Sequence, residues 1–126
     1  MVSKISGIAA LLGVLGIALG AFGAHSLKDK LNPENLLNFE TGVRYMMYHV
    51  LGILLVNNSF LKDGTKLFVC SFFFLGILFF SGSLFVISTG FIEAKEIWFI
   101  TPLGGLLFIS GWFVAAIGFF KGNADN

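Results

Sequence analysis

Four long apolar runs, separated by short polar connections, constrain this chain more than any other feature of its sequence. Each run is roughly twenty residues long, and the charged residues fall almost entirely in the gaps between runs. A bilayer core about 30 Å thick needs roughly 20 apolar residues to be crossed by one helix. The runs that meet this length are 5–24, 42–60, 66–89 and 101–120.

The composition agrees with a membrane protein and argues against a soluble one. Hydrophobic residues make up 56% of the 126-residue chain, and charged residues only 12%, where about 25% is usual for a soluble domain. Backbone N–H and C=O groups cannot stay unpaired in lipid, and no run alternates as barrel strands do. We therefore predict an all-α fold, an integral membrane bundle of four transmembrane helices forming the single domain 1–126.

The connection between the first two runs is the longest polar stretch, and it contains the start signals of a helix. Asn32 is a favoured N-cap residue, Pro33 suits the first helical position, and Glu34 complements the helix dipole. Two interpretations fit the apolar residues that follow at helical spacing. One is a short interfacial amphipathic segment before the second transmembrane helix, which the predicted fold includes. The other is a continuous helix with a solvated first third.

Small residues recur at helical spacing in the first and fourth runs. In membranes such seams let two helices approach closely, so that van der Waals contact supplies the attraction. We predict that the seams pack the helices against one another or against a partner, with the first helix central to the bundle or at a subunit interface. The predicted packing residues are Gly13, Gly16, Gly20, Gly23, Gly104, Gly111 and Gly118.

Ionisable side chains at membrane depth are costly, so each one is a candidate functional residue. In the second run Glu40 and Arg44 are four residues apart, which favours an ion pair, and His49 is the deepest ionisable group. His25 ends the first run on the same side of the membrane. We predict a polar pocket just below the outer face, built from His25, Arg44, Tyr45, His49, Ser83 and Thr101.

Such a pocket admits several interpretations. Two histidines suit a proton relay or the ligation of haem or a metal, and a histidine beside tyrosine and arginine suits a quinone or a lipid headgroup. Alternatively, His49 forms a hydrogen bond to another helix and fixes the packing. Trp112 lies in the middle of the fourth run, where its indole N–H needs a partner on another helix. Because no metal-ligand or cofactor motif is present, we predict no catalytic residue, metal or cofactor.

Four ordered motifs resemble the DUF423 family of small bacterial membrane proteins, which is related to the transmembrane protein 256 group of eukaryotes. The motifs are LGAFGAH at 19–25, TGVRY at 41–45 with YH at 48–49, FSGSL at 80–84, and TPLGG at 101–105 with GW at 111–112. The resemblance implies four membrane helices and no assigned activity. Met46 stands where the family commonly has glutamine, which weakens any shared polar site.

Two functions are therefore considered first. The leading one is a non-enzymatic accessory or scaffold component that packs through its glycine seams. The second is a binding or transport module for a small lipophilic or protonatable ligand, such as a quinone, a lipid or a proton, in the outer pocket. An enzyme acting on lipids or through a redox cofactor ranks third, because no nucleophile lies beside a base.

Partners and location follow from the same features. The expected partners are the lipid bilayer and either a homo-oligomer or a partner membrane protein. Nucleic acid is excluded, because the formal charge is only +1 and no dense basic cluster occurs. The resemblance implies the bacterial plasma membrane. A slight excess of lysine in the connections on the side of the N-terminus predicts that both termini are cytoplasmic.

Overall fold

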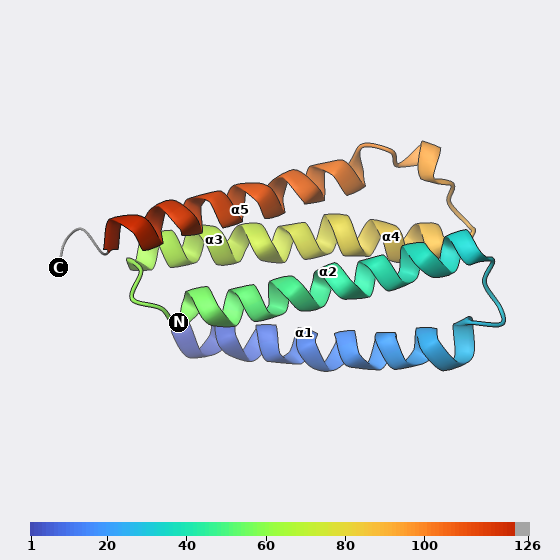
Figure 1. Ribbon diagram of the computed structural model, residues 1–126, viewed down its shortest axis with the longest axis horizontal. Coiled ribbons are helices and arrows are strands. Elements are labelled where there is room, and N and C mark those ends of the chain that lie inside the picture. Colours follow the sequence, from blue (N-terminus) through green and yellow to red (C-terminus); the bar gives the residue numbers. More distant parts are fainter. Residues whose placement is uncertain (123–126) are drawn as a thin grey trace.

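The computed structural model describes residues 1–122, which form four helical rods joined by short connections, and these residues contain no strand. The rods lie side by side, and the N-terminus and the end of the last rod are at the same end of the bundle (Figure 1). The elements are α1 (Val2–Phe22) with the π-helical turn η1 (Gly23–Leu27), α2 (Pro33–Asn57), α3 (Asp63–Gly76) with the π-helical turn η2 (Ile77–Ser81) and α4 (Gly82–Ser88), the 3-10 turn η3 (Ala94–Glu96), and α5 (Ile100–Gly122). The prediction of an all-helical fold is confirmed.

Helix α2 begins as its sequence predicts and runs without a break. The Asn32 side chain accepts a hydrogen bond from the N–H of Asn35 at 2.8 Å, and Pro33 occupies the first turn. No separate interfacial segment precedes the helix, so the continuous-helix interpretation holds. The reason is packing: Phe39, in the first third of α2, is already buried between Gly23 of η1 and Phe85 of α4.

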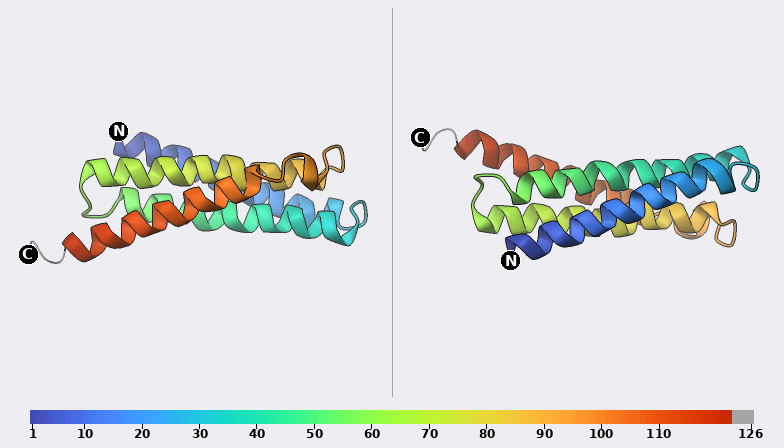
Figure 2. Two further views of the ribbon diagram at one scale, coloured as in Figure 1. Left: turned by 90° about the horizontal axis from the view of Figure 1, so that it is seen from above. Right: turned by 90° about the horizontal axis from the view of Figure 1, so that it is seen from below.

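The central helix of the bundle is α2. The sequence analysis instead predicted that the first helix is central or lies at a subunit interface. α2 contacts α1 on one side and α3, η2 and α4 on the other, and it contributes more buried residues than any other helix. α1 packs chiefly against α2 and leaves its other faces exposed. The views in Figure 2 show α1 and α5 as the outer rods, crossing the inner ones at an angle.

Glycine in α1 lets that helix approach the side chains of α2. A Cβ atom added at Gly20 would lie 3.4 Å from the Val43 side chain, and one at Gly23 would lie 2.7 Å from the Phe39 ring. Gly16 meets the flexible end of Met47 in the same way, while Gly13 is only in ordinary contact distance of Val50. This seam is therefore filled by side chains of the same molecule.

The seam of α5 is tighter, because one of its glycines lies against a backbone. A Cβ at Gly104 would lie 2.8 Å from the Cα of Phe80, and it would also contact the Phe80 backbone nitrogen. Further along α5, Gly111 lies under the Phe73 ring and Gly118 under Leu61. The glycines of α5 thus set the closest approach between two helices in the bundle.

Within residues 1–122, three helices are long and apolar enough to cross a membrane, by length and composition. They are the continuous rods Val2–Leu27, Asp63–Ser88 and Ile100–Gly122. The rod α2, which contains most of the predicted span 42–60, is not among them, because Glu40, Arg44 and His49 lower its hydropathy. The predicted membrane bundle is therefore supported at the level of three candidate spans.

Two local features concern the helix ends. Gly64 lies in the first turn of α3 and does not have a positive φ; within residues 1–122 the positive φ belongs to Gly90, at 80°. Helix α5 begins at Ile100, so Thr101 is inside its first turn and is not its N-cap. Its hydroxyl is consequently free to bond to another helix.

Candidate functional site

His49 lies in the middle of α2, where α3 and α5 approach it, and its side chain is only 4% exposed. The indole Nε1–H of Trp112 donates a hydrogen bond to Nε2 of His49 at 3.0 Å. The Nδ1 atom of His49 is 2.7 Å from the backbone oxygen of Tyr45. Because indole can only donate, Nε2 must accept, and the ring proton is on Nδ1, which donates to Tyr45. The imidazole is therefore neutral, with both nitrogens used.

Aromatic rings enclose the faces and edges of this imidazole. The Phe108 ring stacks on it with a centroid separation of 3.4 Å and an interplanar angle of 10°. The Phe73 ring meets it edge-on at 5.0 Å. Gly52, one turn along α2, leaves the room that the rings of Phe73 and Trp112 occupy. His49 is thus held by contacts on three helices.

The sequence predicted a partner on another helix for Trp112 and offered interhelical bonding as one interpretation of His49. The structure makes each the partner of the other. The surrounding rings of Phe73 and Phe108 were missed, because which rings meet depends on the neighbours of α2 in space. The Tyr45 side chain lies at the exposed edge of this cluster: its ring is nearly parallel to that of His49 at a centroid distance of 6.4 Å, and it packs on Phe80 at 4.8 Å.

Ser83 and Thr101 form a second polar contact between helices. Their hydroxyl groups are hydrogen-bonded to each other, and the Ser83 hydroxyl is also 2.9 Å from the backbone oxygen of Phe80. Ser83 is buried, so the pair joins α4 to the first turn of α5. This pair was predicted to share one pocket with His49, but no hydrogen bond or ring contact within residues 1–122 joins either residue directly to His49; Phe80 and Phe108 lie between them.

His25 is not brought to His49. It is exposed in η1, two residues beyond Gly23, which packs against Phe39. Phe39 is ten residues before His49 on α2, a rise of roughly 15 Å. No group of three or more histidine, cysteine, aspartate or glutamate side chains within residues 1–122 is placed to hold a metal ion.

Arg44 is exposed on the outer side of α2, and the ion pair predicted between it and Glu40 is not formed. Within residues 1–122 the ion pairs are Lys66 with Asp63 and Lys95 with Glu93. The six predicted pocket residues therefore occupy separate places. His49 is in a buried cluster with the Tyr45 ring at its edge, Ser83 and Thr101 form a separate link, and His25 and Arg44 are exposed. The predicted set does not form one pocket.

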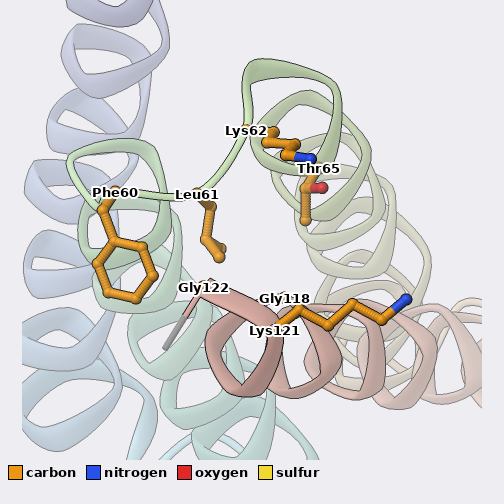
Figure 3. A pocket seen from close by; sticks show the side chains of 7 residues that line it. All are labelled: Phe60, Leu61, Lys62, Thr65, Gly118, Lys121 and Gly122. Atoms are coloured by element: carbon orange, nitrogen blue, oxygen red, sulfur yellow. The ribbon is translucent and has the colours of Figure 1, made fainter. Parts of the chain in front are cut away.

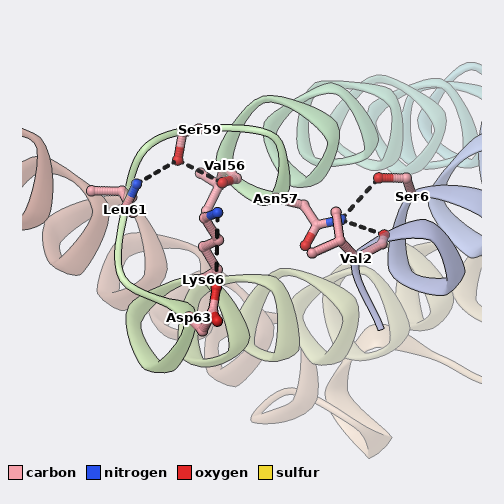
Figure 4. A network of polar contacts seen from close by, with 8 residues as sticks. All are labelled: Val2, Ser6, Val56, Asn57, Ser59, Leu61, Asp63 and Lys66. Carbon is pink, nitrogen blue, oxygen red and sulfur yellow. Dashed lines mark hydrogen bonds and ion pairs between the residues drawn. The ribbon is translucent and has the colours of Figure 1, made fainter.

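Two further polar links were missed by the sequence analysis. Asn57, 1% exposed at the end of α2, donates through Nδ2 to the backbone oxygen of Val2 at 2.7 Å and to the hydroxyl of Ser6 at 2.8 Å, as Figure 4 shows. The buried Ser81 hydroxyl donates to the backbone oxygen of Gly42 at 2.7 Å. The sequence signal that could have indicated these links is a polar residue within an apolar run, facing a glycine or a chain end on the neighbouring helix.

At the end of the bundle that holds the α4–α5 connection, two adjoining cavities of about 360 and 390 Å³ occur. Glu34 and Lys95 line both, and Asn38, Trp98 and Thr101 line the larger one. Thr101 is thus the predicted pocket residue that reaches a cavity at this end. Cavities of about 300–1,000 Å³ are of the size that holds small ligands.

Comparison with known proteins identifies relatives along nearly the whole chain. The family described as a protein of unknown function, DUF423, matches residues 19–105. A UPF0382 membrane protein of Haemophilus influenzae is 41% identical over 123 residues, covering 96% of this chain and 97% of the relative. The UPF0382 membrane protein YwdK of Bacillus subtilis is 39% identical over 87% of this chain and 90% of its own length.

A more distant relative carries a location in its name. The UPF0382 inner membrane protein YgdD of Escherichia coli is 34% identical, over 87% of this chain and 84% of its own length. No solved structure shows significant similarity to the chain.

Proposed function

Because the chain belongs to the DUF423 family of membrane proteins of unknown function, we propose that it is a non-enzymatic accessory or scaffold component of the bacterial plasma membrane. One observation supports this proposal: candidate functional residues buried in the bundle, such as His49, form hydrogen bonds between helices. Both ring nitrogens of His49 are occupied by Trp112 and the Tyr45 carbonyl. A side chain bound in this way has no free lone pair for a metal and no free proton for a relay.

The proposal includes α2 as a fourth transmembrane helix. Its 25 residues correspond to roughly 37 Å, enough to cross a bilayer core of about 30 Å. It packs between α1 and the rod 63–88, so a membrane that surrounds those two rods also surrounds α2. The N-terminus and the end of α5 lie at one end of the bundle, which agrees with an even number of crossings and with both termini on the cytoplasmic side (Figure 1).

A scaffold needs an outward contact surface, and α2 has one. Exposed residues follow heptad spacing along the side of α2 that no other helix covers, and they define the α2 stripe: Leu37, Arg44, Tyr48, Leu51 and Leu55. An arginine facing hydrocarbon costs about 2.5–3.5 kcal/mol on insertion scales. This cost favours an arrangement in which the stripe is covered by protein.

The occupant that we propose is a second copy of this chain, because Arg44 of the stripe has an acidic residue of opposite charge, Glu40, beside it on the same helix. Glu40 and Arg44 are both exposed, one turn apart, and unpaired within residues 1–122. Across a two-fold axis that brings two α2 helices together, Glu40 of each copy can pair with Arg44 of the other. The glycine seams cannot serve this purpose, since side chains of the same molecule fill them.

Cysteine cross-linking in native membranes tests the scaffold proposal. In a Cys70→Ala background, Leu51→Cys is expected to give a disulfide-linked dimer. The matched control is Leu11→Cys, which is also well exposed, on α1, and at a similar height, since Gly13 packs against Val50. Equal cross-linking at both positions, or none at residue 51, would contradict the proposal.

A charge-exchange experiment tests the pairing itself. Each single reversal, Glu40→Arg or Arg44→Glu, is expected to weaken the dimer, because like charges then meet across the axis. The double variant restores opposite charges and is expected to recover most of the dimer fraction in analytical ultracentrifugation. If the double variant is no better than the worse single one, the two residues do not pair between copies.

A second candidate function, a binding module for a small lipophilic ligand, is favoured by the cavities near η3. Trp98 and Thr101 supply an apolar ring and a hydroxyl there, and Glu34 and Lys95 supply charges at the mouth. Organic extraction of the protein purified in mild detergent, followed by mass spectrometry, would detect a bound quinone. A Trp98→Ala variant should lose that compound, whereas its equal recovery from both proteins would remove this candidate.

A further inference from the structure

The end of the bundle near the chain ends holds a cavity of about 360 Å³ that the function proposed above does not use. It is bounded by the α2–α3 connection, the first turn of α3 and the last turns of α5. Figure 3 shows the side chains that surround it, and they are Phe60, Leu61, Lys62, Thr65, Gly118, Lys121 and Gly122. Residues more than fifty positions apart in sequence meet around this space.

The described residues that line the cavity are positively charged. Lys62 and Lys121 are both exposed, and neither makes an ion pair with residues 1–122. No acidic side chain of residues 1–122 lines the cavity. Asp63, the acidic residue next to Lys62 in sequence, lines a different cavity, where its Oδ1 atom is 4.0 Å from Nζ of Lys66. Within residues 1–122 the lining therefore carries two positive charges and no negative one.

Neutral hydrogen-bond donors add to this charge. The first N–H groups of a helix have no partner within the helix and carry a partial positive charge. In α2 the Asn32 side chain satisfies one of them, but no side chain caps α3, whose N-cap is Lys62. The hydroxyl of Thr65, in the same turn, makes no hydrogen bond within the described part of the chain. The first N–H groups of α3 and the Thr65 hydroxyl therefore lie beside the positively charged lysines of the cavity.

The remaining wall of the cavity is apolar. Leu61 is buried, and a Cβ added at Gly118 would lie 2.9 Å from its side chain, so the α2–α3 connection is in close contact with α5. Phe60 forms the adjoining edge. A ligand suited to this space combines an anionic group with an apolar part.

We propose that this cavity binds a phosphate group, held between Lys62, Lys121 and the uncapped start of α3. The source that the surroundings favour is the headgroup of an anionic phospholipid. The cavity lies where α3 begins and α5 ends, at the ends of two candidate spans, and so at the boundary of the membrane. Lysines at this depth attract anionic headgroups, and the first N–H groups of a helix bind phosphate oxygens. The apolar wall suits the glycerol and the first acyl carbons.

Native mass spectrometry of the full chain in mild detergent tests the proposal. The probes are short-chain phosphatidylglycerol, short-chain phosphatidylcholine and inorganic phosphate, each titrated separately. The test variant is Lys62→Gln with Lys121→Gln. The matched control is Lys28→Gln with Lys30→Gln, which removes the same charge from exposed lysines at the opposite end of the bundle. Circular dichroism verifies that both variants keep the helical fold.

The expected result is one tightly bound phosphatidylglycerol that phosphatidylcholine does not replace. The test variant should bind it about 25-fold more weakly, from roughly 5-fold for each lysine, while the control changes little. If inorganic phosphate displaces the lipid, the site recognises the phosphate group alone and a soluble anion is the source. Equal loss in both variants, or equal binding of the two lipids, would overturn the proposal. None of these outcomes depends on dimer formation through the α2 stripe, so this proposal and the scaffold proposal can fail separately.

Discussion

The two outer rods of the bundle are attached in different ways, although both present glycine to their neighbours. α1 lies on flexible side chains of α2, and its hydrogen bonds to α2 are at one end, at Asn57. α5 lies against the backbone of the rod 63–88 and is also joined by the pairs Trp112–His49 and Ser83–Thr101. The difference shows that a glycine seam alone does not determine how rigid a helix contact is. The rigidity depends on whether the glycine faces a flexible side chain or a backbone.

The largest expected effect comes from filling the seam of α5. Gly104→Ala places a methyl group against the Phe80 backbone, which cannot rotate away as a side chain can. Overpacking of this kind costs about 1–3 kcal/mol, and we expect the upper end of that range. Unfolding in a mixed detergent series measures the change. Gly7→Ala is the control, since no atom lies within 4 Å of the added methyl. If the two variants have equal stability, the close approach of α5 is not present.

The attachment of the N-terminus is expected to be next in size. Asn57→Ala removes two hydrogen bonds and leaves the Val2 carbonyl and the Ser6 hydroxyl without that donor. The expected loss is about 1–2 kcal/mol of unfolding free energy. Asn38→Ala, which removes an amide that makes no hydrogen bond within residues 1–122, should have little effect. Faster proteolysis near residue 2 in the Asn57 variant alone would support the link, and equal rates would speak against it.

Removing the indole donor should have a smaller effect. Trp112→Phe keeps an aromatic ring near Gly52 but leaves Nε2 of His49 without a donor. Hydrogen bonds between membrane helices contribute about 0.6 kcal/mol on average and up to about 1.7, and we expect about 1 kcal/mol here. The control is Trp98→Phe, because Trp98 is exposed and makes no hydrogen bond within the described residues. A loss of equal size in both variants would show that only ring size matters.

The smallest effect is expected at the seam of α1. Gly16→Ala brings a methyl group to the sulfur of Met47, and this side chain can move to another rotamer. We therefore expect a change below about 1 kcal/mol, against the larger loss predicted for Gly104→Ala. The same unfolding series measures both. A loss at Gly16 that equals or exceeds the loss at Gly104 would remove the contrast between the two seams.

Much of the fold could be predicted from spacing along single helices. Run lengths, the Asn32–Pro33 start and the small-residue seams all depend on residues within a few turns of one another, and hydrophobicity and capping act at that range. The central position of α2 could not be predicted from spacing along a single helix. Its polar residues lower its hydropathy, yet they are divided between a buried side at His49 and an exposed side at Arg44.

The site was harder to predict, because it depends on which helices are neighbours. His49 and Trp112 are 63 residues apart, and nothing local to either one names the other. The π-helical turn at Ile77–Ser81 adds a further difficulty. A π turn changes the number of residues per turn, so a uniform period of 3.6 misplaces the residues beyond it. Ser81, the last residue of this turn, is buried and bonded to the backbone oxygen of Gly42, and spacing alone did not single it out.

The central claim is that the deepest ionisable residue joins helices, and the protonation of His49 tests it most directly. Nitrogen NMR of ¹⁵N-histidine-labelled protein in lipid, with His25→Asn to leave one labelled histidine, reports which of its two ring nitrogens carries the proton. The structure predicts a neutral ring at neutral pH, with the proton on Nδ1 and Nε2 accepting from Trp112. A proton on Nε2, or a charged ring that exchanges readily with water, would contradict the account.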